Sequence, residues 1–101
     1  MSWIDAGPAN LVDGETRSLA VGRRMVAIAR SGEEYFAIED VCTHDGAELT
    51  GGEIEGAQII CPRHGARFCL RTGEALTPPA YEPVRVFPTR IDDGHLWIRA
   101  D

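Results

Sequence analysis

Runs of alternating apolar and polar residues follow one another along the whole chain, and turn-forming residues separate them. Alternation of this kind has the period of a β-strand, whereas no segment keeps the longer apolar period of an amphipathic helix. The predicted strands, in chain order, span residues 16–21, 24–30, 35–38, 53–55, 58–60, 67–70, 84–91 and 95–99. The pattern therefore predicts an all-β protein.

Glycine, proline and aspartate mark the connections between these strands. A kink at Gly22 separates the first two strands, Ser31–Glu34 forms a hairpin turn, and Asp92–Gly94 closes a terminal hairpin. Thr77–Ala80 is a proline-stiffened loop and not a domain linker, because a strand pattern resumes soon after it. The 101 residues contain no internal repeat and match the common size of one domain, so we expect a single domain over residues 1–101.

The charge balance limits the kinds of partner. Ten basic residues, all of them arginine, stand against sixteen acidic ones and give a formal net charge of −6. This balance argues against nucleic acid or an anionic membrane as a partner. No apolar run is long enough to span a membrane, and the N-terminus lacks a basic segment followed by an apolar one. We expect a monomeric protein of the cytoplasm.

Two short motifs combine cysteine with histidine. The first is Cys42-Thr43-His44, and the second is Cys61-Pro62-Arg63-His64. Sulfur and imidazole donors in this combination suit a soft or borderline metal, zinc or iron, and not a hard oxygen-seeking ion. The turn-forming residues Asp45, Gly46, Pro62 and Gly65 place both motifs in loops.

Two kinds of metal centre use such donors. A structural zinc site can be Cys₂His₂, but it usually groups two cysteines and then two histidines. Here each motif carries one residue of each kind, as a two-iron centre with split ligands would need from two facing loops. The third cysteine, Cys69, has no evident disulfide partner, and we interpret it as a structural thiol in a reducing compartment.

The C-x-H and C-x-x-H motifs together resemble the Rieske [2Fe–2S] signature, in which two cysteines hold one iron and two histidines hold the other. The resemblance implies a Rieske fold, an antiparallel β base with a small cluster-binding subdomain at about residues 41–70. It implies one [2Fe–2S] cluster, with Cys42 and Cys61 on the buried iron and His44 and His64 on the outer iron. Leu49 stands where Rieske proteins have a residue that helps to shield the cluster, with a place in the ordinary core as the other interpretation.

Four further positions in or beside the loops distinguish the branches of the Rieske family. High-potential Rieske proteins carry an additional cysteine in each loop, joined as a disulfide, where this chain has Ala47 and Arg63. They also carry a serine and a tyrosine whose hydroxyls donate hydrogen bonds to cluster sulfur. The matching residues here, Ala66 and Phe68, have no side-chain donor. We therefore expect the oxygenase-associated branch, and a potential toward the lower end of the Rieske span of about −150 to +300 mV.

The chain cannot supply the mononuclear iron site of a terminal oxygenase. The oxygenases of that branch need a mononuclear iron held by two histidines and a carboxylate, and only His95 remains. It also lacks a G-x-G-x-x-G nucleotide fingerprint. We therefore expect an electron carrier without catalytic residues, and not an enzyme.

The resemblance thus implies a ferredoxin that carries single electrons from an NAD(P)H-dependent flavin reductase to a terminal aromatic-ring-hydroxylating dioxygenase. Two alternatives remain open. One is the small Rieske subunit of an NADH-dependent nitrite reductase, and the other, of a different class, is a structural zinc-binding interaction module. Arg63, Arg67 and Arg71 are candidate partner contacts, with a purely solvated role equally open.

Overall fold

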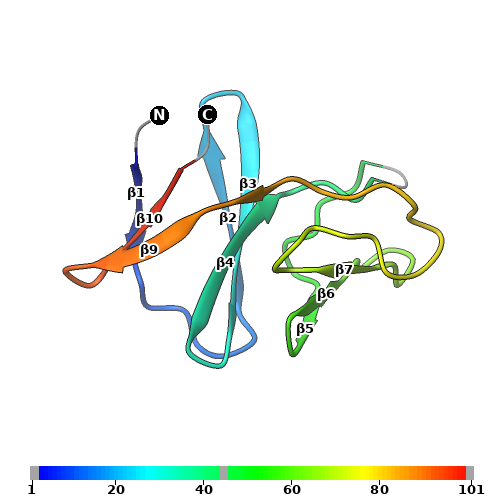
Figure 1. Ribbon diagram of the computed structural model, residues 1–101, viewed down its shortest axis with the longest axis horizontal. Helices are drawn as coiled ribbons and strands as arrows, with labels where there is room; N and C mark the ends of the chain where they lie inside the picture. Colours follow the sequence, from blue (N-terminus) through cyan, green and yellow to red (C-terminus); the bar gives the residue numbers. More distant parts are fainter. Residues whose placement is uncertain (1–2, 44–45, 100–101) are drawn as a thin grey trace.

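Ten β-strands and the loops between them account for the residues that the computed structural model describes, 3–43 and 46–99. In chain order they are β1 (Ile4–Pro8), β2 (Thr16–Val21), β3 (Arg24–Ser31), β4 (Glu34–Glu39), β5 (Glu53–Glu55), β6 (Gln58–Ile60), β7 (Arg67–Cys69), β8 (Val86–Phe87), β9 (Thr89–Asp92) and β10 (His95–Ile98). They form three antiparallel sheets, in the orders β1-β10-β9, β2-β3-β4-β8 and β5-β6-β7 (Figure 1). The predicted all-β class is confirmed. None of the described residues lies in a helix long and apolar enough to cross a membrane.

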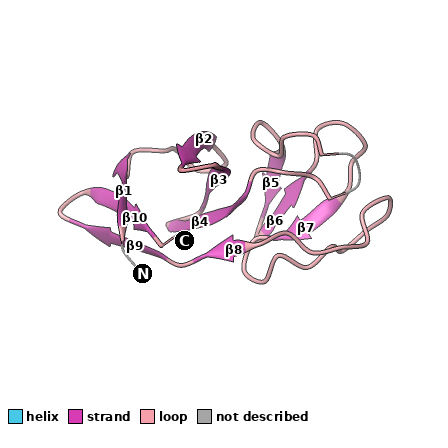
Figure 2. Cartoon of the chain, turned by 90° about the horizontal axis from the view of Figure 1, so that it is seen from above, coloured by secondary structure: helices cyan, strands magenta, loops and turns pink. Residues whose placement is uncertain are grey.

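The first two sheets form a base around one buried core. This base core draws its side chains from strands of both sheets and from the loop after β1, and it consists of Ala6, Leu11, Val26, Ile28, Ala37, Phe87, Leu96 and Ile98. The third sheet lies beyond the base, at one end of the molecule, whereas β1, β9 and β10 lie at the other (Figure 2).

Strand β3 separates the base core from a second core. Successive side chains of a strand point to opposite faces, so Val26 and Ile28 enter the base core while Ala27 and Ala29 face the other way. All four side chains are fully buried. Both faces of this central strand are therefore covered, and small alanines stand on the face that meets the third sheet.

The second core, called here the joint core, joins the base to the third sheet. It contains side chains from β3, β4, β6, β7 and the loops beside them, namely Ala27, Ala29, Phe36, Ile38, Cys42, Leu49, Ile59, Cys61, Ala66, Phe68, Leu70, Ala80 and Val84. Both cysteines of the sequence motifs are among these residues. The motifs therefore lie where the third sheet packs on the base.

Two strand predictions need correction. The expected strand 84–91 is divided at Pro88 into β8, which pairs with β4, and β9, which pairs with β10. Proline has no N–H to continue a ladder, and the chain changes sheets at this point. Strand β1 was not predicted, because glycine, proline and aspartate in Ile4–Pro8 are poor strand formers; it forms by pairing with β10.

Candidate metal centre

The first motif begins a tight turn directly after β4. The N–H of Cys42 donates to the carbonyl of Ala47 (2.6 Å), and the N–H of Gly46 donates back to the carbonyl of Cys42 (2.7 Å). Gly46 has a φ of +79°, a left-handed conformation that glycine adopts without steric cost. His44, the second predicted ligand of this motif, lies outside the described residues.

The second motif forms the same turn between β6 and β7. The N–H of Cys61 donates to the carbonyl of Ala66 (2.7 Å), the N–H of Gly65 donates to the carbonyl of Cys61 (3.0 Å), and Gly65 has a φ of +75°. Each motif therefore places its cysteine at the first position of the turn and a left-handed glycine four residues later. The two loops are matched in hydrogen bonding as well as in sequence.

The two turns bring sulfur inward and leave the second motif's histidine at the surface. The exposed fractions of Cys42 and Cys61 are 0% and 1%, and both residues belong to the joint core. Residues 62–65, which include His64, are exposed. Leu49 is fully buried in the same core as the two cysteines, which is the position expected of a shielding residue.

A third turn of the same kind begins at Cys69. The N–H of Cys69 donates to the carbonyl of Glu74 (2.9 Å), and the N–H of Gly73, with φ +80°, donates to the carbonyl of Cys69 (2.7 Å). Hydrogen bonds from the Thr72 side chain and from the N–H groups of Thr72 and Arg71 lower the pKa of the half-buried Cys69 thiol. The sequence contained a signal for this turn, because a glycine follows each of the three cysteines by four residues.

The proline-rich loop expected only as a connection forms a further wall of the site. The Thr43 hydroxyl, inside the first motif, donates to the carbonyl of Glu82 (2.7 Å). Ala80 is buried in the joint core with both cysteines, whereas the next residue, Tyr81, is 81% exposed. The loop therefore closes over the first motif and presents an aromatic ring to solvent.

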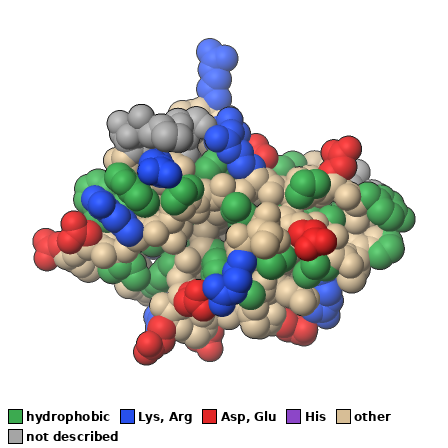
Figure 3. Space-filling model, in the orientation of Figure 1, with side chains coloured by type: hydrophobic (Ala, Val, Ile, Leu, Met, Phe, Trp, Pro, Cys, Tyr) green, Lys and Arg blue, Asp and Glu red, His purple; other side chains and the backbone are tan. Residues whose placement is uncertain are grey.

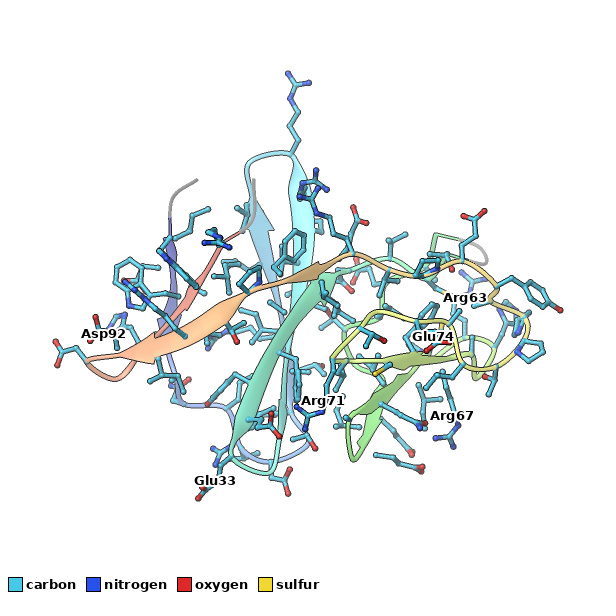
Figure 4. The ribbon with its side chains drawn as sticks, viewed as in Figure 1. Glu33, Arg63, Arg67, Arg71, Glu74 and Asp92 are labelled. Carbon is cyan, nitrogen blue, oxygen red and sulfur yellow. The ribbon has the colours of Figure 1, made fainter. Side chains whose placement is uncertain are left out.

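The candidate partner arginines differ in their surroundings. Arg67 is bound to Glu55 (2.9 Å) and to Gln58 (3.2 Å), and Arg71 forms an ion pair with Glu34. Figure 4 shows Arg71 on the side of the third sheet that meets the base, with Arg63 at the far end near the second motif. The acidic partners of Arg67 and Arg71 favour a structural role for these two residues. Arg63 is an exposed residue of the second motif itself, and its place there makes it the candidate partner contact.

The surface beside the second motif is hollowed. A depression of about 420 Å³ is lined by Gly51, Gly52, Glu53, Ile60, Cys61, Pro62 and Gly65. The space-filling view shows basic side chains scattered among apolar and acidic ones, without a continuous field of one sign (Figure 3). A larger hollow of about 450 Å³ lies away from the motifs, between β4 and the segment Leu70–Arg71.

The donor set and its burial fit a two-iron centre with split ligands. Two buried thiols come from matched turns in one core, and an imidazole stands on the exposed side of the second turn. Among residues 3–43 and 46–99, no three His, Cys, Asp or Glu side chains converge as ligands of one ion. A centre with two protein ligands on each of two irons does not require three ligands around one ion. His44, the fourth predicted ligand, lies outside these ranges.

Comparison with known proteins identifies the family. The model of the Rieske [2Fe-2S] domain matches residues 2–88, which is most of the chain. The chain belongs to the Rieske [2Fe-2S] domain family. Its cofactor is accordingly one Rieske-type [2Fe–2S] cluster, and the zinc-module alternative is not supported.

Individual relatives place the chain more finely within the Rieske family. The anthranilate 1,2-dioxygenase ferredoxin subunit of Burkholderia cepacia is 38% identical over 95% of this chain and 90% of its own length. The structure of the Sphingomonas yanoikuyae B1 ferredoxin is 30% identical, covers 99% of this chain and 100% of its own, and has a TM-score of 0.91. The ferredoxin in a complex of reduced oxygenase and oxidized ferredoxin of carbazole 1,9a-dioxygenase is 33% identical, covers 95% and 91%, and has a TM-score of 0.88.

All three relatives are ferredoxins, and two of them, those of anthranilate 1,2-dioxygenase and carbazole 1,9a-dioxygenase, are named as components of oxygenase systems. The chain is therefore an electron carrier of the Rieske ferredoxin type and not an enzyme, as the sequence predicted. A structure described as an NADH-dependent nitrite reductase small subunit from Mycobacterium tuberculosis shares the fold at a TM-score of 0.86, but only 22% of the sequence. That likeness concerns the fold alone.

Proposed function

We propose that this chain carries single electrons from an NAD(P)H-dependent flavin reductase to a terminal aromatic-ring-hydroxylating dioxygenase. The observation that carries the proposal is the pair of matched turns, which bury Cys42 and Cys61 in one core and leave His64 exposed. A redox group held in this way has a protected inner side and an outer side at the surface. That arrangement suits electron exchange with a docked partner.

The proposed ligands of the cluster are Cys42, His44, Cys61 and His64, within a single domain of residues 1–101 whose cluster-binding subdomain spans about 41–70. When bound, the cluster supplies a one-electron couple, and neutral imidazole ligands make its potential higher than that of an all-cysteine centre. The protein's own contribution is to exclude water from the thiolates and to close both turns with backbone hydrogen bonds. Buried Leu49 and Ala80 support the first part of that role.

The proposed electron acceptor is the oxygenase component. A ferredoxin with 33% identity to this chain has a structure in complex with its oxygenase, carbazole 1,9a-dioxygenase, which supports a partner of the same class here. The proposed donor is a flavin-dependent ferredoxin reductase. We place the exchange in the cytoplasm, where NAD(P)H is available and thiols such as Cys69 stay reduced, and we propose neither a nucleic acid nor a membrane as a partner.

Substitution of this chain for a related ferredoxin tests the function. The purified protein, with the reductase and oxygenase of the Burkholderia cepacia anthranilate 1,2-dioxygenase system, should couple reductant consumption to hydroxylation. A control without this ferredoxin sets the background rate. The protein should also contain iron and acid-labile sulfide in equal amounts; stoichiometric zinc without sulfide would contradict the proposal.

Charge reversal beside the second motif tests the docking side. Arg63→Glu should slow electron transfer at low salt, with the difference shrinking as ionic strength rises, while the optical spectrum stays unchanged. Arg23→Glu is the matched control, because it makes the same charge change at an exposed turn between β2 and β3, in the base. Equal rates for the two variants at low salt would remove Arg63 from the docking side.

The nitrite reductase alternative differs in assembly. A small subunit of such an enzyme should co-purify stoichiometrically with a sirohaem protein, whereas a shuttle should behave as a monomer that is reversibly reduced. The greater identity to dioxygenase ferredoxins favours the shuttle.

A further inference from the structure

One carboxylate is buried at the start of the first motif. Asp40 is 5% exposed and is the only charged side chain among the described residues that is buried. Its Oδ1 accepts hydrogen bonds from the N–H groups of Leu49 (2.7 Å) and Thr50 (2.9 Å). Its Oδ2 accepts from the hydroxyls of Ser18 (3.1 Å) and Thr50 (2.7 Å).

These contacts fasten both ends of the loop that carries the first motif. Asp40 stands two residues before Cys42, and its own N–H donates to the carbonyl of Met25 on β3 (2.9 Å). The side chain then reaches across the loop to Leu49 and Thr50, the residues where the chain leaves the motif, while Ser18 ties it to β2. A single carboxylate thus fastens the entry and the exit of the loop to the base.

Four hydrogen-bond donors from three residues converge on this carboxylate. All four of its partners act as donors, which is the arrangement that an ionised carboxylate requires. None of the four donors is itself charged, and among residues 3–43 and 46–99 no ion pair involves Asp40, so hydrogen bonds alone disperse its charge there. By chain geometry the Cα atoms of Asp40 and Cys42 are no more than about 7.6 Å apart. The carboxylate itself binds the N–H of Leu49, which is buried in the same core as Cys42. Charges interact more strongly in a buried medium of low dielectric constant than in water.

We propose that Asp40 is a positioning residue for the first motif and that its buried charge lowers the reduction potential of the centre. The proposal rests on the proposed function, because it requires the cluster to be held at Cys42. Reduction adds an electron, and a fixed negative charge nearby disfavours that step. Asp40 would then add to the effect of Ala66 and Phe68, which offer no side-chain hydrogen bond to favour the reduced state.

The variant Asp40→Asn separates charge from contacts. Its amide oxygen can replace Oδ1 and accept from the two N–H groups, while its NH₂ can donate to the two hydroxyls, which rotate to accept. The network survives in shape and loses only its charge. In protein-film voltammetry the potential of the cluster-loaded variant should shift upward. An unchanged or lower potential would overturn the electrostatic part of the proposal.

Ser18→Ala makes the opposite change, because it keeps the charge and removes one hydrogen bond that disperses it. The reduction potential of the cluster-loaded Ser18→Ala variant should shift slightly downward. An upward shift or no shift would contradict the proposal, and this test holds even if Asp40→Asn fails to hold the cluster. The positioning role has its own readout, the rate at which a chelator removes iron. Ser18→Ala and Thr50→Val should both release iron faster than the unmodified protein, and unchanged rates in both would overturn that role.

Failure of the proposed function can be distinguished from failure of the proposal about Asp40. If the unmodified protein assembles no Rieske cluster, the function itself is wrong. If it shows a normal Rieske signal and the Asp40 and Ser18 variants do not change its potential, only the inference about Asp40 is wrong.

Discussion

Arg71 and Glu34 form a two-fold hydrogen-bonded ion pair that joins the end of the third sheet to the base. The two contacts measure 2.8 Å and 2.7 Å, and the Arg71 guanidinium also lies over the Phe36 ring, 5.4 Å from its centroid. Glu34 begins β4, whereas Arg71 follows β7, so residues far apart in sequence meet here. The pair lies at the surface, with both side chains 55% exposed.

The first prediction concerns the pH dependence of this pair. Hydrogen bonding and charge attraction from Arg71 lower the pKa of Glu34 below its ordinary 4.5. The stability it contributes is therefore present above pH 4.5 and is lost as pH falls through the lower folded pKa. Glu34→Gln should lower the melting temperature slightly at pH 7 and at low salt, and the difference should vanish in strong acid. A difference that persists in strong acid would assign the effect to packing.

Local patterns predicted most of the hairpins, because the two strands of a hairpin are consecutive in the chain. Each strand shows its own alternation of apolar and polar residues, and the turn between them shows its turn-forming residues. β5 and β6 begin and end at the predicted residues. β1 could not be found in this way, since its strand character comes from β10 at the other end of the chain. The same limit applies to the contacts of Arg67 and Arg71, which only the packed sheets bring together with their acidic partners.

The ligand motifs were visible in the sequence because each is a run of three or four residues, recognisable by its donor types and their spacing. The burial of Cys42 and Cys61 in one core was not, since it depends on how the third sheet packs against β3. Asp40 gave no signal of its own, because an aspartate before a loop is ordinary in sequence and acquires meaning only through four converging donors.

The second prediction concerns a close backbone crossing. A Cβ atom on Gly73 would lie 2.0 Å from the Val84 carbonyl oxygen, where the third turn meets the chain leaving the proline-rich loop. Gly73→Ala should destabilise the fold by about 1–3 kcal/mol through crowding, beyond the cost of its positive φ of about 1–2 kcal/mol. Gly32→Ala is the control, since Gly32 has a positive φ and open space around it. Equal melting temperatures for the two variants would show that the crossing relaxes.

The third prediction concerns Cys69. Its pKa lies below the ordinary value of 9.0, chiefly because the Thr72 side chain donates a hydrogen bond to the sulfur. The rate of alkylation by iodoacetamide should therefore reach its midpoint at a lower pH than that of a simple thiol. Thr72→Val should move the midpoint upward, and Cys69→Ser should abolish the reaction in the cluster-loaded protein. A midpoint that Thr72→Val does not change would disprove the stated cause.

The fourth prediction concerns ligation. Replacing His44 or His64 by Ala or Cys should abolish the characteristic Rieske electron paramagnetic resonance signal. Cys42→Ser or Cys61→Ser should largely prevent assembly, because a hard oxygen replaces a thiolate. Cys69→Ser is the internal control, since Cys69 begins the same kind of turn and is not a proposed ligand. Its iron and sulfide content should be nearly unchanged, and loss of the cluster there would mean that the ligands are wrongly assigned.

The last prediction concerns the reduction potential. Ala66 and Phe68 are fully buried in the joint core, and neither side chain can donate a hydrogen bond to cluster sulfur. Ala66→Ser and Phe68→Tyr each add one hydroxyl, which should favour the more negative reduced state. A hydrogen bond that is stronger by about 1–1.4 kcal/mol in the reduced state corresponds to a rise of about 40–60 mV for a one-electron couple. Ala66→Cys has a similar size but a weaker donor, so it should raise the potential less. Voltammetry that shows equal rises for serine and cysteine would assign the effect to volume, and a strongly positive potential in the unmodified protein would argue against the oxygenase-associated branch.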